Sequence, residues 1–247
     1  MKPLPTLSEF TTENYRNYQH KNMIDDFFEY PEGKERLVLR NQAIQRIDDI
    51  IIFHRFVMAT HENNQKSIEP AFKLLNKHYD GMFDNIRHDN PEEVSTARMA
   101  FKGFDIYKQQ EQVMSIANES LVINLWATIE QYATRALKLI FPANTAISHV
   151  WAEVEKKFAQ KNINIKLLPS YDTINEIRVL NNKIKHSYCV DNALANFPSF
   201  SEHKGKTISE VPLRVQDYTI ATYHFIIQII NKIGPSERYT DDEEENP

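Results

Sequence analysis

Residues 113–140 read VMSIANESLVINLWATIEQYATRALKLI and contain the clearest apolar pattern in the chain. The apolar residues recur every three or four positions, which is the spacing of one face of an α-helix. They are Val113, Ala117, Leu121, Leu125, Ile129, Tyr132, Ala136 and Ile140. The pattern predicts a long helix from about Glu93 to Phe141 with one continuous buried face and a break near Gly103. Pro142 ends it, because proline cannot continue the backbone hydrogen bonding.

The segments on either side show the same periodicity. Before the long helix we expect one helix from Lys34 to about His61 and a second from Ser67 to about Phe83, with Pro70 in its first turn. After it we expect a helix around residues 147–161, one opening at residues 169–173, and a last one from Pro212 to a stop at Gly234. Thr173 and Glu176 match a capping box. Residues 191–211 read as a long loop.

Glycine content supports a helical fold. The 247 residues include 5 Gly, whereas average usage near 7% would give about 17. Sheet folds and phosphate-binding loops use glycine at turns and close backbone approaches. No two of these glycines are close enough to build a nucleotide-cradling loop. We therefore predict an all-α helical bundle with a long central helix, in which any phosphate is bound by side chains.

The chain is predicted to have three parts. Residues 1–105 form an N-terminal arm and helical extension, residues 106–235 a helical bundle, and residues 236–247 an acidic disordered tail. The tail includes five consecutive carboxylates at 241–245.

Charge and cysteine content narrow the setting. Lys+Arg 29 against Asp+Glu 34 gives a net charge of −5, so no global basic field indicates a nucleic-acid coat. Without the five tail carboxylates the rest is close to neutral, which leaves room for a local basic patch. Cys189 alone cannot form an internal disulfide. No apolar run approaches the 18 or so residues of a membrane span. We expect a cytoplasmic protein with no membrane partner.

Two short motifs are incomplete. Gly205-Lys206-Thr207 resembles the end of a phosphate-binding loop, but the first glycine of that motif would fall on Phe200, and no strand precedes it. His61-Glu62 begins a zinc-protease motif, but its second histidine position is Gln65. We therefore predict no metal site and no cofactor.

The informative segment is residues 178–188, RVLNNKIKHSY. On helical geometry Asn182, Lys185 and His186 lie along one side, and Arg178 lies about two turns before His186. Cationic side chains can hold a phosphate while an imidazole moves a proton near neutral pH. The spacing alone favours a solvated helix face with an incidental histidine over such a site.

This segment resembles the signature of HEPN domains, small all-α bundles whose late helix carries Arg, four to six residues, then His. His186 matches the histidine, Asn182 the polar residue that commonly follows the arginine, and Tyr188 the trailing tyrosine of some toxin members. Residues 125–132 resemble the preceding long helix. With four intervening residues the arginine position falls on Asn181, and the nearest arginine, Arg178, is separated from His186 by seven.

The resemblance implies metal-independent RNA cleavage in a groove between two protomers of a homodimer. His186 would act as general acid or base, Arg178 or Lys185 would stabilise charge on the phosphate, and Asn182 would orient it. The further binding residues would be Asn181, Lys183 and Tyr188, with Glu130 as a supporting partner. Family members often act as toxins or in phage defence, so a regulatory or antitoxin protein is a further expected partner.

Two alternatives stay open. The chain could be a HEPN-like module that has lost catalysis, as the uncharged Asn181 indicates, and that serves in dimerisation or RNA binding. It could also be a plain helical scaffold with a solvated histidine.

Overall fold

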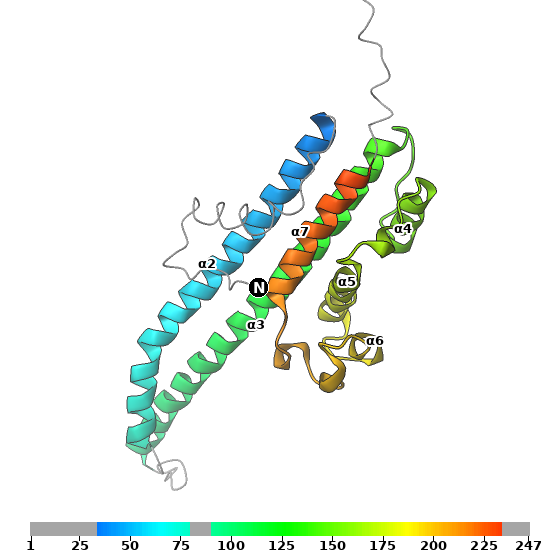
Figure 1. Cartoon of the computed structure of the whole chain (residues 1–247). Coiled ribbons are helices and arrows are strands. Elements are labelled where there is room, and N and C mark those ends of the chain that lie inside the picture. Colours follow the sequence, from blue (N-terminus) through cyan, green and yellow to red (C-terminus); the bar gives the residue numbers. More distant parts are fainter. Residues whose placement is uncertain (1–33, 80–89, 234–247) are drawn as a thin grey trace, which may run out of the picture. The chain divides into compact units, whose positions relative to one another are not determined.

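The computed structural model describes residues 34–79 and 90–233, and every regular element in these ranges is helical (Figure 1). The α-helices are α2 (Lys34–Tyr79), α3 (Pro91–Ile140), α4 (Trp151–Gln160), α5 (Tyr171–His186), α6 (Asn192–Ala195) and α7 (Val215–Lys232). Short 3-10 helices are η4 (Ile165–Leu167), η5 (Ser201–His203) and η6 (Ile208–Glu210). The β-type pairing within the described residues is an isolated bridge between Cys189 and Thr207. The prediction of an all-α fold is confirmed.

The chain divides into two compact units. Unit 1 combines the residues up to Phe53 with those from Glu119 onward, and unit 2 spans His54–Asn118. Both long helices, α2 and α3, contribute residues to each unit. The predicted boundary between residues 105 and 106 therefore falls within α3, and the division into 1–105 and 106–235 stays a prediction.

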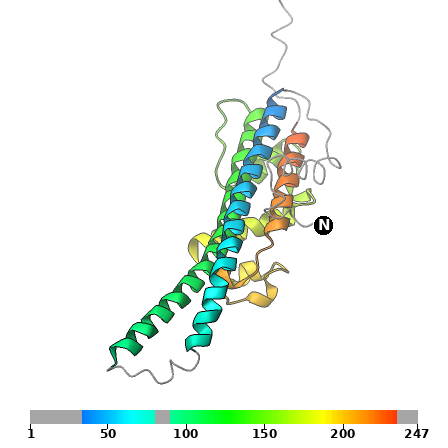
Figure 2. The same ribbon diagram turned by 90° about the vertical axis from the view of Figure 1, so that its left-hand side faces the viewer.

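The core of unit 1 is built from the first part of α2, the last part of α3 and all of α7, which lie side by side in both ribbon views (Figures 1 and 2). Aromatic rings join these helices to α4: the ring centroids of Trp126 and Trp151 are 5.0 Å apart, and Phe225 packs 6.2 Å from Trp151. Helix α7 is buried on almost every side. A helix with that burial pattern belongs at the centre of its bundle.

Buried polar contacts fix how these three helices meet. The Tyr132 hydroxyl of α3 donates to the Gln42 carbonyl of α2 at 2.8 Å. The Tyr223 hydroxyl of α7 donates to the Asp48 carboxylate of α2. Because buried polar groups are costly unless they are paired, such contacts select one arrangement of the helices over others that would bury a similar apolar area.

Helix α2 corrects the prediction of two helices over residues 34–61 and 67–83. It is continuous from Lys34 to Tyr79 with Pro70 in its interior. The polar residues 62–66 contain no glycine or proline, so nothing in that stretch interrupts the helix. Pro70 is exposed, and its missing N–H costs one hydrogen bond of a long helix. Residues 80–83 lie outside the described residues.

Helix α3 has nearly the predicted bounds, Pro91–Ile140, but it is continuous. It begins at Pro91 and passes Gly103 without the predicted break. Asn90 organises its start, because its side-chain oxygen accepts a hydrogen bond from the Glu92 N–H at 3.1 Å. Val113 is 41% exposed, so the predicted continuous buried face is wrong at that residue. Val113 belongs to unit 2, in which the described elements are two helical segments, and two helices cover less of each other than the bundle of unit 1 does.

Three smaller predictions are corrected within unit 1. Residues 191–211 contain α6, η5 and η6 instead of an unstructured loop, and α4 begins at Trp151. The capping box of Thr173 and Glu176 is absent, because α5 begins after Ser170 and the Glu176 carboxylate binds other groups. The predicted N-terminal arm, the helix stop at Gly234 and the acidic tail lie outside the described residues.

None of the helices in the described ranges is long and apolar enough to cross a membrane.

Candidate nucleic-acid interface on helix α5

Helix α5 is held in unit 1 by one apolar face. Ile174, Ile177 and Leu180 are completely buried, and the helix packs against α6 and α7. These residues are three apart, so they occupy one side of the helix and leave the polar residues between them on the other. The packing therefore fixes which side chains of α5 face outward.

The outward-facing residues include three of the four predicted catalytic residues. Asn182, Lys185 and His186 are exposed in the last turns of the helix. No hydrogen bond or ion pair joins the His186 side chain to another residue in the described part of the chain. We refer to Arg178, Asn182, Lys185 and His186 as the α5 polar face. Its C-terminal end presents an imidazole, an ammonium group and an amide within five residues of sequence.

Arg178 is not brought to that end. Its Nε and Nη2 donate to the Asn175 Oδ1 at 3.1 and 2.9 Å. Asn175 precedes Arg178, so the guanidinium is held on the side of the helix N-terminus, away from His186. The eight-residue offset adds about 12 Å along the axis. Lys185 is therefore the cation of the α5 polar face that lies nearest to His186.

Two other predicted binding residues are engaged within the protein. Asn181 is 1% exposed, so the structure separates it from the exposed group. Its Nδ2 donates to the Asn182 Oδ1 at 3.4 Å, and its own Oδ1 has no hydrogen-bond partner among the described residues. The Lys183 ammonium forms an ion pair of 2.6 Å with Asp191. Much of the Lys183 charge is thus offset locally.

Tyr188 lies just after the helix in an unusual backbone conformation. Its φ of 50° is in the left-handed region, which costs a residue with a side chain about 1 kcal/mol or more. Its N–H donates to the Lys183 carbonyl at 2.7 Å and so closes the end of α5. Its hydroxyl donates to the Glu119 carboxylate of α3 at 2.5 Å. These contacts hold the chain directly beyond His186 against α3.

Glu130 lies on α3 within the electrostatic reach of the same end of α5. Burial raises the pKa of this half-buried carboxyl, whereas a hydrogen bond from Trp126 and the positive charge of Lys185 lower it. The charges of Glu130 and Lys185 therefore interact, and the supporting role of Glu130 stays a prediction.

Sequence reasoning missed Glu119. It lies eleven residues before Glu130, and eleven residues are close to three helical turns, so the two carboxylates lie on one side of α3. That spacing was a usable signal. However, only the folded chain shows that Tyr188 reaches Glu119.

A buried carboxylate anchors the opposite side of α5. Glu176 is 3% exposed. Its Oε1 accepts hydrogen bonds from the Tyr218 hydroxyl at 2.7 Å and the Ser199 hydroxyl at 2.8 Å. Its Oε2 accepts from Arg214 at 2.7 Å. This network joins α5 to α7 and to the segment after α6, and it sets the rotation of α5 about its axis.

The α5 polar face has the groups needed to bind an anion and to transfer a proton. Lysine binds phosphate as a point charge, and histidine is the side chain suited to proton transfer near neutral pH. In the described residues, no group of three or more His, Cys, Asp or Glu side chains is arranged to hold a metal ion.

No protein-family model, no curated protein and no solved structure matches the chain.

Proposed function

We propose that this chain is a HEPN-like, metal-independent endoribonuclease that works in the groove of a homodimer. The observation that carries the proposal is the exposed His186 at the end of α5, with Lys185 and Asn182 beside it and no internal partner among the described residues for its imidazole. The all-α fold and the likeness of residues 178–188 to the HEPN signature support the same assignment.

The proposed reaction is transfer of a phosphodiester to the neighbouring ribose 2′-oxygen. His186 takes the proton from the 2′-hydroxyl, or gives one to the leaving 5′-oxygen, as general base or acid. The 2′-oxygen forms a bond to phosphorus while the bond to the 5′-oxygen breaks, leaving a cyclic phosphate and a 5′-hydroxyl. Lys185 stabilises the charge that develops on the phosphate oxygens, and Asn182 orients them.

The remaining residues have supporting roles in this proposal. Glu130 orients Lys185 through their electrostatic interaction. Arg178, held toward the helix N-terminus by Asn175, binds a neighbouring phosphate of the same strand. By the same resemblance, the protein is a cytoplasmic toxin or phage-defence effector with a partner protein that restrains it.

A second candidate is a HEPN-like module without catalysis that dimerises or binds RNA. Two observations favour it: Asn181 is buried at the position where four-residue spacing would put the arginine, and Arg178 is bound to Asn175. In addition, Lys183, Lys185 and His186 occupy the last turn of α5, where positive charge stabilises any helix by complementing its dipole.

The deciding experiment is cleavage of structured RNA by the full-length chain in excess EDTA. We expect cleavage by the wild type, almost none by His186→Ala, and full activity of Ser187→Ala, a matched control at the next exposed position. Cleavage that survives His186→Ala unchanged would refute the enzyme assignment. Absence of cleavage together with retained RNA binding would favour the inactive module.

A further inference from the structure

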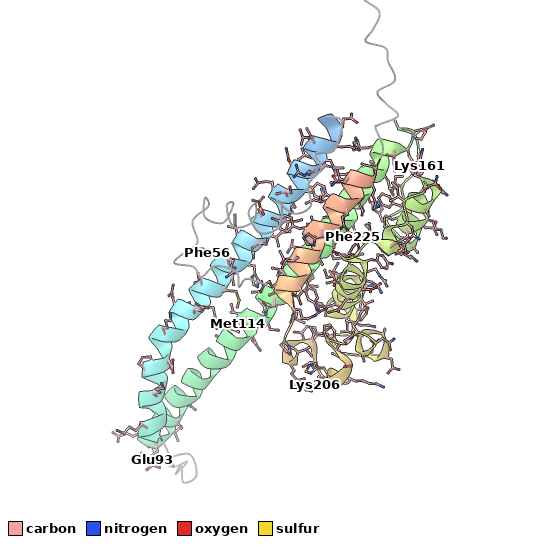
Figure 3. All side chains as sticks on the ribbon, viewed as in Figure 1. Phe56, Glu93, Met114, Lys161, Lys206 and Phe225 are labelled. Atoms are coloured by element: carbon pink, nitrogen blue, oxygen red, sulfur yellow. The ribbon has the colours of Figure 1, made fainter. Side chains whose placement is uncertain are left out.

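The connection between α6 and α7 contains a second basic segment, residues His203–Lys206, which we call the basic turn. Lys204 and Lys206 are exposed, and the Lys206 Nζ lies 3.3 Å from the His203 Nδ1. Figure 3 labels Lys206 on this connection. Gly205 has a φ of +86°, and a Cβ placed on it would meet nothing within 4 Å. The turn therefore needs glycine for its backbone conformation and has open space above it.

Backbone hydrogen bonds hold the basic turn against the segment that follows α5. The Gly205 N–H donates to the Val190 carbonyl at 2.8 Å, and the Val190 N–H donates to the Lys206 carbonyl at 3.0 Å. The Ile208 N–H donates to the Tyr188 carbonyl at 3.3 Å. Val190 and Ile208 are buried in the core of unit 1, so this pairing is fixed in place.

The pairing sets the distance between the basic turn and the α5 polar face. Val190 is four residues after His186, and four residues span at most about 14 Å even when fully extended. The backbone of the turn lies within hydrogen-bonding distance of Val190. A nucleic-acid strand of a few nucleotides could therefore contact both segments.

The lysines of the basic turn form no ion pair with the described residues, although acidic groups lie near them. No carboxylate in the described part of the chain lies within ion-pair distance of Lys204 or Lys206. The Glu210 carboxylate accepts hydrogen bonds from the Thr207 hydroxyl at 2.6 Å and N–H at 2.9 Å, and these bonds together with the nearby positive charge of Lys206 lower its pKa. Asp191 is paired with Lys183. Glu202 is exposed in the turn of η5 and is a second acidic residue beside the basic turn.

We propose that the basic turn is a second phosphate-binding segment, in which Lys204 and Lys206 hold backbone phosphates of the RNA strand whose scissile phosphate lies at Lys185 and His186. This inference rests on the proposed function and adds a binding segment to it. Contacts to phosphates position a strand without reading its sequence. The basic turn thus sets affinity and strand position, while His186 carries the chemistry.

The test measures how RNA binding depends on salt. The probe is a fluorescent single-stranded RNA of about 12 nucleotides, within the range that basic single-strand grooves cover, with 2′-O-methyl riboses so that it cannot be cleaved. Each phosphate contact contributes about 0.7 to the slope of log affinity against log salt for single strands. We expect Lys204→Gln/Lys206→Gln to reduce the magnitude of the slope by about 1.4 relative to wild type.

Two further variants control for charge and for fold. Lys138→Gln/Lys156→Gln removes two exposed lysines elsewhere in unit 1 and should leave the slope within about 0.3 of wild type. Lys204→Arg/Lys206→Arg keeps both charges and should retain the wild-type slope.

The outcomes separate this inference from the proposed function. Wild-type binding with an unchanged slope in Lys204→Gln/Lys206→Gln overturns the basic turn as a binding segment and leaves the proposed function standing. No binding of this probe by the wild type overturns the basic turn as a binding segment, and failure of the proposed function is read separately, from the cleavage of structured RNA by the wild type and His186→Ala. In single-turnover cleavage of an unmodified RNA, Lys204→Gln/Lys206→Gln should need a higher protein concentration than the wild type to reach half of its maximal rate. A loss of maximal rate as large as that of His186→Ala would contradict the assignment of the turn to binding.

Discussion

The Tyr188 hydroxyl donates a hydrogen bond of 2.5 Å to the Glu119 carboxylate, 69 residues earlier in the sequence. The bond joins the residue that closes α5 to the long helix α3 and so fixes the backbone directly after His186. Tyr188 adopts a left-handed backbone conformation in this position. A left-handed backbone conformation at a non-glycine residue persists only where the surrounding structure holds it.

Removal of this hydroxyl should destabilise unit 1 modestly. A hydrogen bond to a charged group contributes about 1.5–3 kcal/mol. Because Tyr188 is partly exposed, we expect Tyr188→Phe to lower the unfolding free energy by about 1 kcal/mol, measured by urea denaturation. The control is Tyr132→Phe. The Tyr132 hydroxyl donates to a neutral carbonyl, and its removal should cost about 1 kcal/mol or less.

If Tyr188→Phe has no further effect on the unfolding free energy in a Glu119→Gln background, the two residues act as a pair. Equal effects of Tyr188→Phe in both backgrounds would contradict that pairing.

Loss of the Glu176 carboxylate should be more damaging. Glu176→Ala leaves the buried Tyr218 hydroxyl without its acceptor and removes the buried one of the two ion-pair partners of Arg214, which also pairs with Asp217. Breaking a buried pair costs about 3–5 kcal/mol, and we expect about 3 because the Arg214 side chain is 39% exposed. Glu153→Ala, which removes an exposed pair with Lys156, should cost less than about 0.5 kcal/mol. Similar denaturation midpoints for the two variants would show that the network does not anchor α5.

Stability should fall at high pH because of Tyr171. Burial and the hydrogen bond to Glu155 raise its pKa from 10.0 to about 12. The unfolded chain then loses this proton before the folded protein does, so the contribution of Tyr171 is fully present below pH 10 and is lost as the pH rises toward 12. Tyr171→Phe should show a shallower decline of unfolding free energy across that window than the wild type. Parallel pH profiles for the two proteins would argue against the raised pKa.

The interaction between Lys185 and Glu130 can be measured directly. Burial raises the pKa of the Glu130 carboxyl and the charge of Lys185 lowers it. Lys185→Gln removes the lowering charge, so the Glu130 pKa should rise further in this variant when it is followed by NMR of the side-chain carboxyl carbon. Lys138→Gln, on the exposed surface of α3, serves as the control. No change in either variant would place Lys185 away from Glu130.

If the chain is a ribonuclease, Lys185 should matter more than Arg178. Lys185 adjoins His186. Arg178 lies about 12 Å from His186 along the helix axis, and its side chain is hydrogen-bonded to Asn175. Removing a group that stabilises transition-state charge typically lowers kcat by about 10²–10³. We expect a loss of that size for Lys185→Gln and less than about tenfold for Arg178→Gln in single-turnover cleavage. A larger loss of activity in Arg178→Gln than in Lys185→Gln would indicate that Arg178 acts as the arginine of the family signature.

Local signals predict most of the helices but not their full lengths. The spacing of apolar residues and Pro142 place the end of α3 correctly, since both act within a few residues of sequence. Pro70 indicates a helix start and Gly103 a break, yet α2 and α3 continue through them. One proline or glycine costs little free energy compared with the free energy that the many hydrogen bonds of a long helix contribute. The spacing of residues in the sequence does not compare these two free energies.

The exposed end of the candidate site was also predictable. The apolar stripe of α5 fixes which side is buried, so Asn182, Lys185 and His186 had to face outward. Asn181 follows Leu180 and lies at the edge of that stripe, and its burial depends on how α5 is rotated by the Glu176 network. The neighbouring helices set the rotation of α5 about its axis, and the spacing of its apolar residues does not specify that rotation.

Local sequence patterns were enough to predict the helical fold of the described residues and the exposed histidine at the end of α5, because helix faces repeat every few residues and need no distant partner. Only the tertiary structure brought Glu119 to Tyr188 and the basic turn to the segment after His186. Those contacts join residues far apart in sequence, and they form because buried Val190 and Ile208 and the packed helices hold the segments together. Such contacts depend on how the whole unit packs, and a pattern within a short stretch of sequence does not contain that information.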